Sequence, residues 1–314
     1  MFILYKNRTF GEYISETFDF LKENGKHFFK QFFTILGIPL LILSFLMYYI
    51  MNIYQNFILN NSINSGNMPD FELYFSNNLP ILFIVLSVFI VFTILLSVLL
   101  YSFPVLYLKL YDENNGLNFG TKELINEFKN NFTRILVYFF LMFFTMIVIM
   151  FIVIIPLFIS IITIVGPFII LGFIYLFNIL SLYIYLNNKN LSFFDSIKIA
   201  FDGIKNNFWS TVVSVFVMYI LVSIMSGIVS MIGAGFNFVE MITTIQTKTL
   251  PEDNEIGIYS VFVAFLTILS YIVQYTLMNL PMLTGGLVYY SMQDHKENIN
   301  VKSDIDLIGT QELD

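Results

Sequence analysis

The sequence predicts an all-α integral membrane protein: six transmembrane helices in three tandem parallel repeats, each preceded by a cytoplasmic amphipathic interfacial helix. Three observations predict this fold. Hydrophobic residues make up 57% of the chain and charged residues only 12%, about half the charged share of an ordinary soluble domain. Uninterrupted apolar runs exceed the roughly 18 residues that indicate a membrane-spanning helix. One amphipathic pattern also recurs along the chain.

The apolar runs predict six spans. The continuous apolar stretch from Ile135 to Leu186 would measure roughly 78 Å as one helix, far more than a bilayer core of about 30 Å can hold. It must fold back, and Pro156 and Val-Gly-Pro at 165–167 are natural helix breakers. The last run is also too long to be straight, and we expect Pro281 and the pair Gly285–Gly286 to bend it. The predicted spans are residues 32–54, 79–108, 135–156, 165–187, 209–233 and 256–292.

Positive charge predicts how the spans are oriented. Of the 15 Lys and Arg residues, all except Lys248 fall in segments that six spans place on one side of the membrane. Positively charged segments stay in the cytoplasm, so both termini are expected to be cytoplasmic. The Asn-, Ile-, Lys- and Phe-rich composition is typical of bacteria. We therefore expect a multi-pass protein of the bacterial cytoplasmic (inner) membrane.

The recurring amphipathic pattern predicts the repeats. The segment TFGEYISETFDFLKENG at 9–25 returns as SFFDSIKIAFDGIKNNF at 192–208, 183 residues downstream. A shorter copy, NFGTKELINEFKNNF, lies at 118–132. Each copy precedes an odd-numbered span. Repetition of this kind predicts a repeated structural unit.

Within each copy, apolar residues recur at the spacing of one helix face. Such a helix is expected to lie along the membrane surface with its apolar face in the lipid. A capping pair begins two of the copies, Thr9 with Glu12 and Ser192 with Asp195. The predicted membrane-interface residues are Phe10, Ile14, Phe18, Leu21, Leu124, Phe128, Phe193, Ile197, Phe201 and Ile204.

The even-numbered spans also end alike, in VLYLKLYDENNG, SLYIYLNNKN and LVYYSMQDHKEN. The repeated unit is therefore surface helix, span, outer loop and span, with units at 1–116, 117–190 and 191–298 and a flexible cytoplasmic tail at 299–314. Every unit begins and ends on the same side, which weighs against an inverted-repeat transporter. The alternative interpretation is chance similarity, because amphipathic helices before spans are common and the composition is biased.

The sequence predicts no catalytic, cofactor-binding or metal site. No Asp, Glu, Lys, Arg or His lies in the core of a predicted span, and such residues usually mark transporters and membrane enzymes. His27 and His295 lie at predicted span borders. The absence of cysteine excludes disulfides and thiolate metal sites, and no basic patch with interleaved aromatic residues indicates nucleic-acid binding. We therefore expect a protein that is not an enzyme and does not bind nucleic acid.

Polar and small residues gather in the sixth span, at Gln274, Asn279, Pro281, Gly285 and Gly286. One interpretation is a bendable segment that lines a cavity or a lipid groove. The other, which we prefer, is close helix packing with interhelical hydrogen bonds.

Two segments resemble a known family. FGEYISETFDFLKENGKHFF at 10–29 and GGLVYYSMQDHKEN at 285–298 are similar to the bacterial glycerophosphodiester phosphodiesterase membrane-domain family and its stand-alone relatives, which have six or eight spans and this type of surface helix. The last span of that family often ends in Tyr-Tyr-Asp-x-Arg; here Tyr289–Tyr290 is present and the Arg is not. The resemblance implies a membrane module without catalytic activity, since the phosphodiesterase chemistry belongs to a separate soluble domain.

Together these observations favour a non-enzymatic membrane protein, a lipid-interacting scaffold or accessory subunit, with membrane lipids and other membrane proteins as partners. The alternative is a transporter or channel for a neutral or amphipathic solute, with the sixth span as its moving element. The sequence leaves the ligand and the oligomeric state open.

Overall fold

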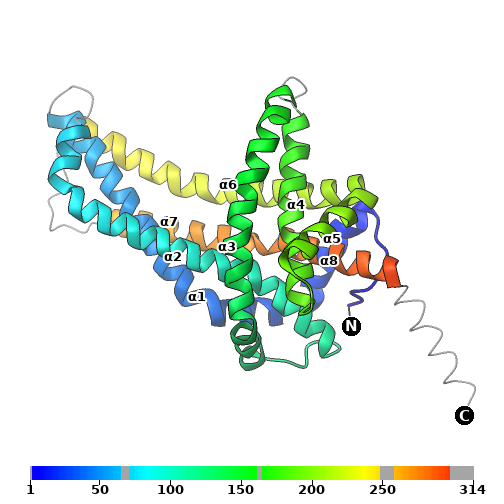
Figure 1. Cartoon of the computed structure of the whole chain (residues 1–314). Helices are drawn as coiled ribbons and strands as arrows, with labels where there is room; N and C mark the ends of the chain where they lie inside the picture. Colours follow the sequence, from blue (N-terminus) through cyan, green and yellow to red (C-terminus); the bar gives the residue numbers. More distant parts are fainter. Residues whose placement is uncertain (1, 65–70, 161–164, 248–257, 298–314) are drawn as a thin grey trace, which may run out of the picture. The chain divides into compact units, whose positions relative to one another are not determined.

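The computed structural model describes residues 2–64, 71–160, 165–247 and 258–297, and the regular structure within them is entirely helical (Figure 1). The helices are α1 (Phe10–Asn64), α2 (Phe71–Glu113), α3 (Thr121–Ser160), α4 (Val165–Asn187), α5 (Phe193–Asn206), α6 (Phe208–Thr247), α7 (Ile258–Leu277) and α8 (Asn279–Glu297). The predicted tail at 299–314 lies outside the described residues.

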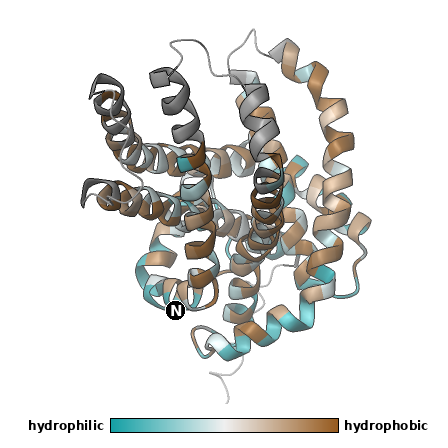
Figure 2. Cartoon of the chain, turned by 90° about the vertical axis from the view of Figure 1, so that its left-hand side faces the viewer, coloured by the Kyte–Doolittle hydropathy of each residue, from teal (hydrophilic) through white to brown (hydrophobic). Residues whose placement is uncertain are grey.

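Six helical segments of the described chain are long and apolar enough to cross a membrane, which confirms the predicted multi-pass architecture. Figure 2 shows hydrophobic residues along the helices and hydrophilic residues gathered near the N-terminus. Several segments extend past the predicted spans because the helix continues from the apolar run into charged residues. The segments are Phe10–Ile53, Phe83–Glu113, Thr121–Phe158, Gly166–Asn187, Phe208–Phe236 and Val261–Lys296.

Two of the three predicted surface helices are not separate from their spans. Both α1 and α3 run without interruption from the amphipathic segment into the apolar run, and no glycine in either helix has a positive φ that would end it. Only the third copy forms a helix of its own, α5, which ends where Asn207 leaves the helical conformation with φ −132° and ψ 44°. The prediction of three separate surface helices is therefore wrong for the first two copies, whose helices continue into a span.

The helix of the predicted sixth span is interrupted at Met278, three residues before Pro281. The bend itself stays a prediction. Helix α7 ends at Leu277 and α8 begins at Asn279, so Pro281 occupies the first turn of α8. Proline has no N–H for the carbonyl four residues back, that of Leu277, and its ring crowds that carbonyl. Gly285 and Gly286, which we also expected to bend this span, lie within the continuous helix α8.

The amphipathic segments begin with similar caps. At the start of α1, the backbone N–H and the hydroxyl of Thr9 both donate to the Glu12 carboxylate at 2.8 Å. At the start of α5, Ser192 and Asp195 form the predicted capping box in both directions. At α1, the bond from the Thr9 N–H to the Glu12 carboxylate is one half of the predicted box. The remaining segment repeats half of this arrangement, since the N–H of Gly120 donates to the carboxylate of Glu123 at 2.9 Å.

The chain divides into two compact units. Unit 1 comprises Met1–Ile35, Val98–Val222 and Met278–Asp314, and unit 2 comprises Leu36–Ser97 and Ser223–Leu277. The predicted middle repeat falls wholly within unit 1, whereas the first and third repeats contribute residues to both units.

The core of unit 1 is built from the three segments with similar sequences at the ends of the even-numbered spans. Residues 102–111 of α2, 179–186 of α4 and 279–291 of α8 are buried without exception. Helix α4 contacts α3, α5 and α8. Tyrosines join the three segments: the Tyr290 hydroxyl donates to the Leu108 carbonyl and the Tyr183 hydroxyl to the Met282 carbonyl, both at 3.1 Å.

Glycines allow α8 to approach its neighbours closely. A Cβ added to Gly286 would lie 2.5 Å from Leu108 Cδ1 and 2.6 Å from the Tyr183 hydroxyl, and one added to Gly285 would lie 2.3 Å from Ile179 Cγ2. None of these three distances is sterically possible without movement of α2 or α4 side chains. These two glycines are therefore required by packing.

Candidate functional site

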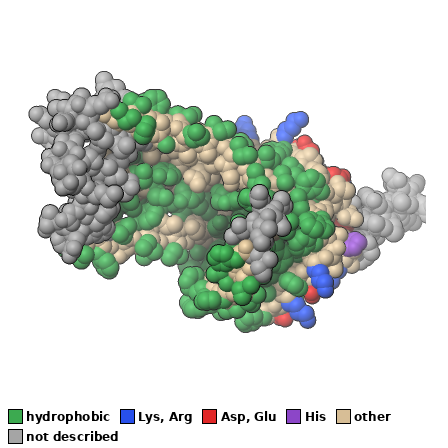
Figure 3. Space-filling view, turned by 90° about the horizontal axis from the view of Figure 1, so that it is seen from above, with side chains coloured by type: hydrophobic (Ala, Val, Ile, Leu, Met, Phe, Trp, Pro, Cys, Tyr) green, Lys and Arg blue, Asp and Glu red, His purple; other side chains and the backbone are tan. Residues whose placement is uncertain are grey.

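Charged side chains are confined to one unit in the described chain. Every Asp, Glu, Lys and Arg whose side chain the structure describes belongs to unit 1. Figure 3 shows these side chains gathered on a surface that is otherwise largely hydrophobic. The described charged groups that could bind a ligand therefore all lie in unit 1.

The N-terminal segment, residues 2–8, is held in place by a buried arginine. The Arg8 side chain has no exposed surface, and its Nε donates to the Glu16 carboxylate at 2.7 Å. Its Nη1 donates to the Leu4 carbonyl at 2.7 Å. Lys6 also contacts Glu16, and this hydrogen bond raises the pKa of the Lys6 ammonium. These contacts stabilise the segment. They also use most of the hydrogen-bond donors of the Arg8 guanidinium.

The same segment ties α1 to the ends of α2 and α8. The backbone N–H of Phe2 donates to the Tyr111 hydroxyl at 3.0 Å. The backbone N–H of Arg8 donates to the Ser291 hydroxyl at 3.2 Å, and the Tyr13 hydroxyl bonds the same oxygen at 3.1 Å. Residues that sequence analysis treated only as topology signals thus contribute to the packing of unit 1.

A second ion pair joins α2 to α3. Lys109 pairs with Glu127, whose carboxylate also accepts a hydrogen bond from Asn131 at 2.8 Å. Both charged side chains are largely buried. Sequence analysis placed Lys109 in the loop after the second span, whereas it lies inside α2. The carboxylate that neutralises Lys109 belongs to Glu127 on the next helix, 18 residues along the chain. No pattern within one helix therefore indicated this pair.

Arg134 closes the C-terminal end of α4. Its guanidinium donates to the carbonyls of Tyr185 at 2.6 Å, Lys189 at 2.8 Å and Asn188 at 3.1 Å. It also lies over the Tyr185 ring at 4.2 Å. A cation at this position satisfies carbonyls that have no partner within the helix and complements the helix dipole. Arg134 is therefore a structural residue.

Three helices of unit 1 carry exposed apolar and basic residues along one face, which we call the aromatic–lysine rows. Their members are three or four residues apart, the spacing that places side chains on one helix face. None of their lysines forms an ion pair within the part of the chain that the structure describes. The rows are Phe18, Lys22, Lys26 and Lys30 on α1; Lys122, Ile125, Lys129 and Phe132 on α3; and Phe194, Lys198, Phe201 and Lys205 on α5.

The predicted membrane-interface residues do not share one environment. Phe10, Phe18 and Phe201 are exposed; Ile14, Leu21, Phe128 and Ile197 are half-buried; Leu124, Phe193 and Ile204 are buried. Their contact with lipid stays a prediction.

Within unit 1, the first part of α1 packs against its neighbours through a different face from the predicted apolar stripe. The buried residues of this face include Tyr13, Thr17, Phe20 and Asn24. Among them, the Thr17 hydroxyl lies 3.0 Å from that of Thr284 on α8. The helix therefore has a packed face and an outward apolar face, and sequence periodicity detected only the second.

The residues proposed to line a cavity or act as a hinge in the sixth span belong to different units and differ in burial. Gln274 is exposed and belongs to unit 2, whereas Asn279, Pro281, Gly285 and Gly286 are buried in unit 1. The close approach of both glycines to neighbouring helices favours the packing interpretation.

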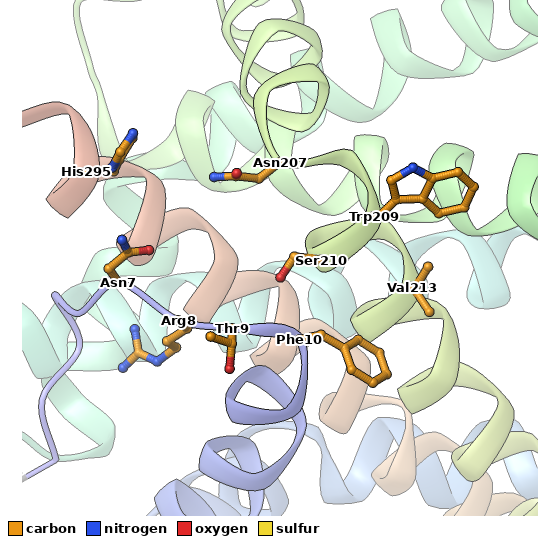
Figure 4. A pocket seen from close by; sticks show the side chains of 9 residues that line it. All are labelled: Asn7, Arg8, Thr9, Phe10, Asn207, Trp209, Ser210, Val213 and His295. Atoms are coloured by element: carbon orange, nitrogen blue, oxygen red, sulfur yellow. The ribbon is translucent and has the colours of Figure 1, made fainter.

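A cavity of about 560 Å³ lies within unit 1, between the starts of α1 and α6 and the end of α8 (Figure 4). Its polar lining includes Asn207, Ser210 and His295, and its apolar lining includes Trp209 and Val213. The rest of the wall comes from the chain just before α1 and from its first residue: Asn7, Arg8, Thr9 and Phe10. Sequence analysis recognised His295 only as a border residue and did not connect it with the others, because three separate segments form this wall.

The chemistry available at these places is recognition by hydrogen bonds and by charge. No group of three or more His, Asp or Glu residues able to hold a metal ion occurs among the described residues. Exposed lysines and unpaired amide and hydroxyl groups can bind phosphate or carboxylate oxygens. Comparison with protein-family models, curated proteins and solved structures found no match to this chain.

Proposed function

We propose that this protein is a non-enzymatic scaffold of the bacterial cytoplasmic membrane that binds anionic phospholipid headgroups through its aromatic–lysine rows. The observation that carries the proposal is the presence of such a row on α1, α3 and α5. Apolar side chains at a membrane surface enter the boundary of the acyl chains, while lysine stems extend toward the headgroups. Each lysine near an anionic surface contributes about 1 kcal/mol of attraction.

The rows also support the proposal of three parallel repeats. Each row lies near the start of one predicted repeat, and each of the three helices begins beside a carboxylate that bonds a backbone N–H. With both termini in the cytoplasm, all three rows would meet the cytoplasmic leaflet, in which anionic lipids are enriched.

The proposed role as a scaffold or accessory subunit, with other membrane proteins as further partners, is consistent with the resemblance to the glycerophosphodiester phosphodiesterase membrane-domain family. We do not propose transport, because the close approach of Gly285 and Gly286 to neighbouring helices supports the packing interpretation of the sixth span, not a bendable segment that lines a cavity.

Lipid retention tests the proposal. The full chain would be purified in mild detergent, and the bound phosphatidylglycerol and phosphatidylethanolamine counted by mass spectrometry. The double variant Lys26→Gln/Lys198→Gln removes one row lysine from each of two helices, and Phe18→Ser/Phe201→Ser removes one aromatic residue from each. We expect each variant to lose phosphatidylglycerol several-fold, with less effect on phosphatidylethanolamine, since only the first lipid has a net charge.

Matched controls use residues outside the rows. Lys189→Gln/Lys296→Gln removes two exposed lysines, and Phe143→Ser/Phe151→Ser removes two exposed phenylalanines from the apolar part of α3. Phe193 is left unchanged, because it is buried and its loss would disturb packing. Equal lipid loss in row and control variants would refute the proposal.

The proposed orientation can be tested separately, because the chain contains no cysteine. Single cysteines in the predicted outer loop 55–78 should react with membrane-impermeant reagents in intact cells, and a cysteine in the tail at 299–314 should react only after lysis. The reverse pattern would contradict cytoplasmic termini.

A further inference from the structure

We infer that the cavity between the starts of α1 and α6 and the end of α8 binds the phosphate group of a membrane phospholipid. This inference rests on the proposed function, because it gives one lipid a defined position beside a surface that recognises headgroups. The cavity lies wholly within unit 1 and its volume of about 560 Å³ is ample for a headgroup and its glycerol.

One part of the cavity wall consists of hydrogen-bond donors. Asn7, Asn207 and His295 contribute exposed polar side chains, and Figure 4 shows them around the same side of the space. Ser210 adds a hydroxyl whose oxygen is inaccessible to solvent and has no hydrogen-bond partner among the described residues. A buried hydroxyl left unpaired costs about 1–3 kcal/mol, so a ligand oxygen that accepted its proton would recover much of this cost.

The backbone at the start of α6 adds donors to the same wall. The first N–H of this region that reaches a carbonyl four residues back is that of Thr211, which donates to Asn207 at 3.1 Å. The N–H groups of Phe208, Trp209 and Ser210 precede it in the first turn and have no such intrahelical partner. Donors at a helix start, together with the unpaired Ser210 hydroxyl, suit the acceptor oxygens of a phosphate.

Arg8 lines the cavity but does not supply its charge. Its guanidinium is directed to Glu16 and to the carbonyls of the N-terminal segment. It therefore positions Asn7 and Thr9 on the wall, and recognition is left to the neutral donors and to His295.

The other part of the wall is apolar and favours a lipid over free phosphate. Phe10, Trp209 and Val213 line this part, and Figure 4 shows their side chains grouped away from Asn7 and His295. Trp209 is 65% exposed, as is common for tryptophan at a membrane interface. A wall that is polar on one side and apolar on the other matches a phosphate joined to glycerol and acyl chains.

Trp209 makes the inference directly testable because it is the only tryptophan in the chain. The full chain in a neutral detergent would be titrated with dihexanoylphosphatidylglycerol while tryptophan emission is recorded. We expect a saturable change. Dihexanoylglycerol, which lacks the phosphate, and inorganic phosphate, which lacks the acyl chains, should each bind at least about tenfold more weakly, the effect of losing roughly 1.4 kcal/mol of contacts.

Variants locate the site. Ser210→Ala and Asn207→Ala each remove one donor and should weaken the titration by about tenfold. Asn206→Ala is the matched control, because Asn206 is an exposed neighbour that does not line the cavity, and it should leave the titration unchanged.

Three results would overturn the inference: equal binding of dihexanoylglycerol, equal binding of inorganic phosphate, or equal weakening by Asn206→Ala. Failure here is distinguishable from failure of the proposed function. If Ser210→Ala leaves the titration unchanged while the row variants still lose bound lipid, the cavity assignment alone is wrong.

Discussion

Units 1 and 2 both contain long apolar helical segments but differ in how many of their side chains are buried. Unit 1 buries whole stretches of α2, α4 and α8, and joins them by tyrosine hydroxyls and closely packed glycines. It also contains the ion pairs Arg8–Glu16 and Lys109–Glu127. In the described part of unit 2, few side chains are buried, and these include Leu40, Leu43 and Val263. Most of its large apolar residues face outward.

The difference in burial between the units can be explained by how helices associate in a lipid bilayer. Lipid is as apolar as leucine, so an outward leucine in a bilayer costs little, and helix association there depends on close packing and polar contacts. Unit 1 contains those contacts and every described charged side chain. We therefore expect substitutions in unit 1 to lower stability far more than matched substitutions in unit 2.

The largest effect is expected from Arg8→Met. The change removes the buried cation beside Glu16 and the donor to the Leu4 carbonyl, and should lower the free energy of unfolding by about 3 kcal/mol. Denaturation in detergent would measure it, with exposed Lys189→Met as the control. Addition of Glu16→Gln should cost less in the Arg8→Met background than in the natural chain, because the two residues share one interaction. Strict additivity would show that the pair is not coupled.

A smaller effect is expected from Gly286→Ala in unit 1. The same substitution at Gly235 allows a direct comparison with unit 2. The new methyl group would overlap Leu108 and Tyr183, and overpacking costs about 1–3 kcal/mol. Gly235→Ala in unit 2 meets nothing within 4 Å, so it should be neutral or stabilising by up to about 1 kcal/mol through helix propensity. Thermal unfolding of both variants measures the contrast. Equal shifts in the two would show that the units do not differ in packing.

The smallest effect is expected from Tyr290→Phe, which removes only the hydroxyl that donates to the Leu108 carbonyl. We expect a loss of about 1 kcal/mol in the free energy of unfolding. Tyr49→Phe in unit 2 alters a half-exposed residue and should change stability by less than about 0.5 kcal/mol. An equal effect of both changes would mean that the buried tyrosine contacts do not distinguish unit 1.

Particular residues show how far sequence reasoning reached. The capping box of Ser192 and one half of that of Thr9 were predicted correctly, because a cap depends on residues only three positions apart. The interruption of the helix at Met278 lies close to Pro281, where a bend was predicted, since proline acts on its own helix. The stripe that begins at Phe10 was detected, but not the packed face of α1 that contains Tyr13, because that face depends on a neighbouring helix.

The candidate site was less predictable than the fold. The spacing of Lys22, four residues after Phe18, was a local signal of the aromatic–lysine row on α1. A periodicity that counts only apolar residues does not detect this signal. Ser210 and His295 gave no comparable signal. They are far apart in sequence and line one cavity only through the packing of α6 and α8 with the chain before α1.

The sequence by itself determined the all-helical class, the six apolar segments and the capping box that begins α5, and it predicted a disturbance of the helix close to Met278. Each of these depends on composition or on residues within a few positions of one another. Only the tertiary structure decided that Arg8 and Lys109 are buried in ion pairs, that Gly286 packs against α2 and α4, and that three segments line a cavity. These features depend on how separate segments of the chain pack against one another, which no local pattern specifies.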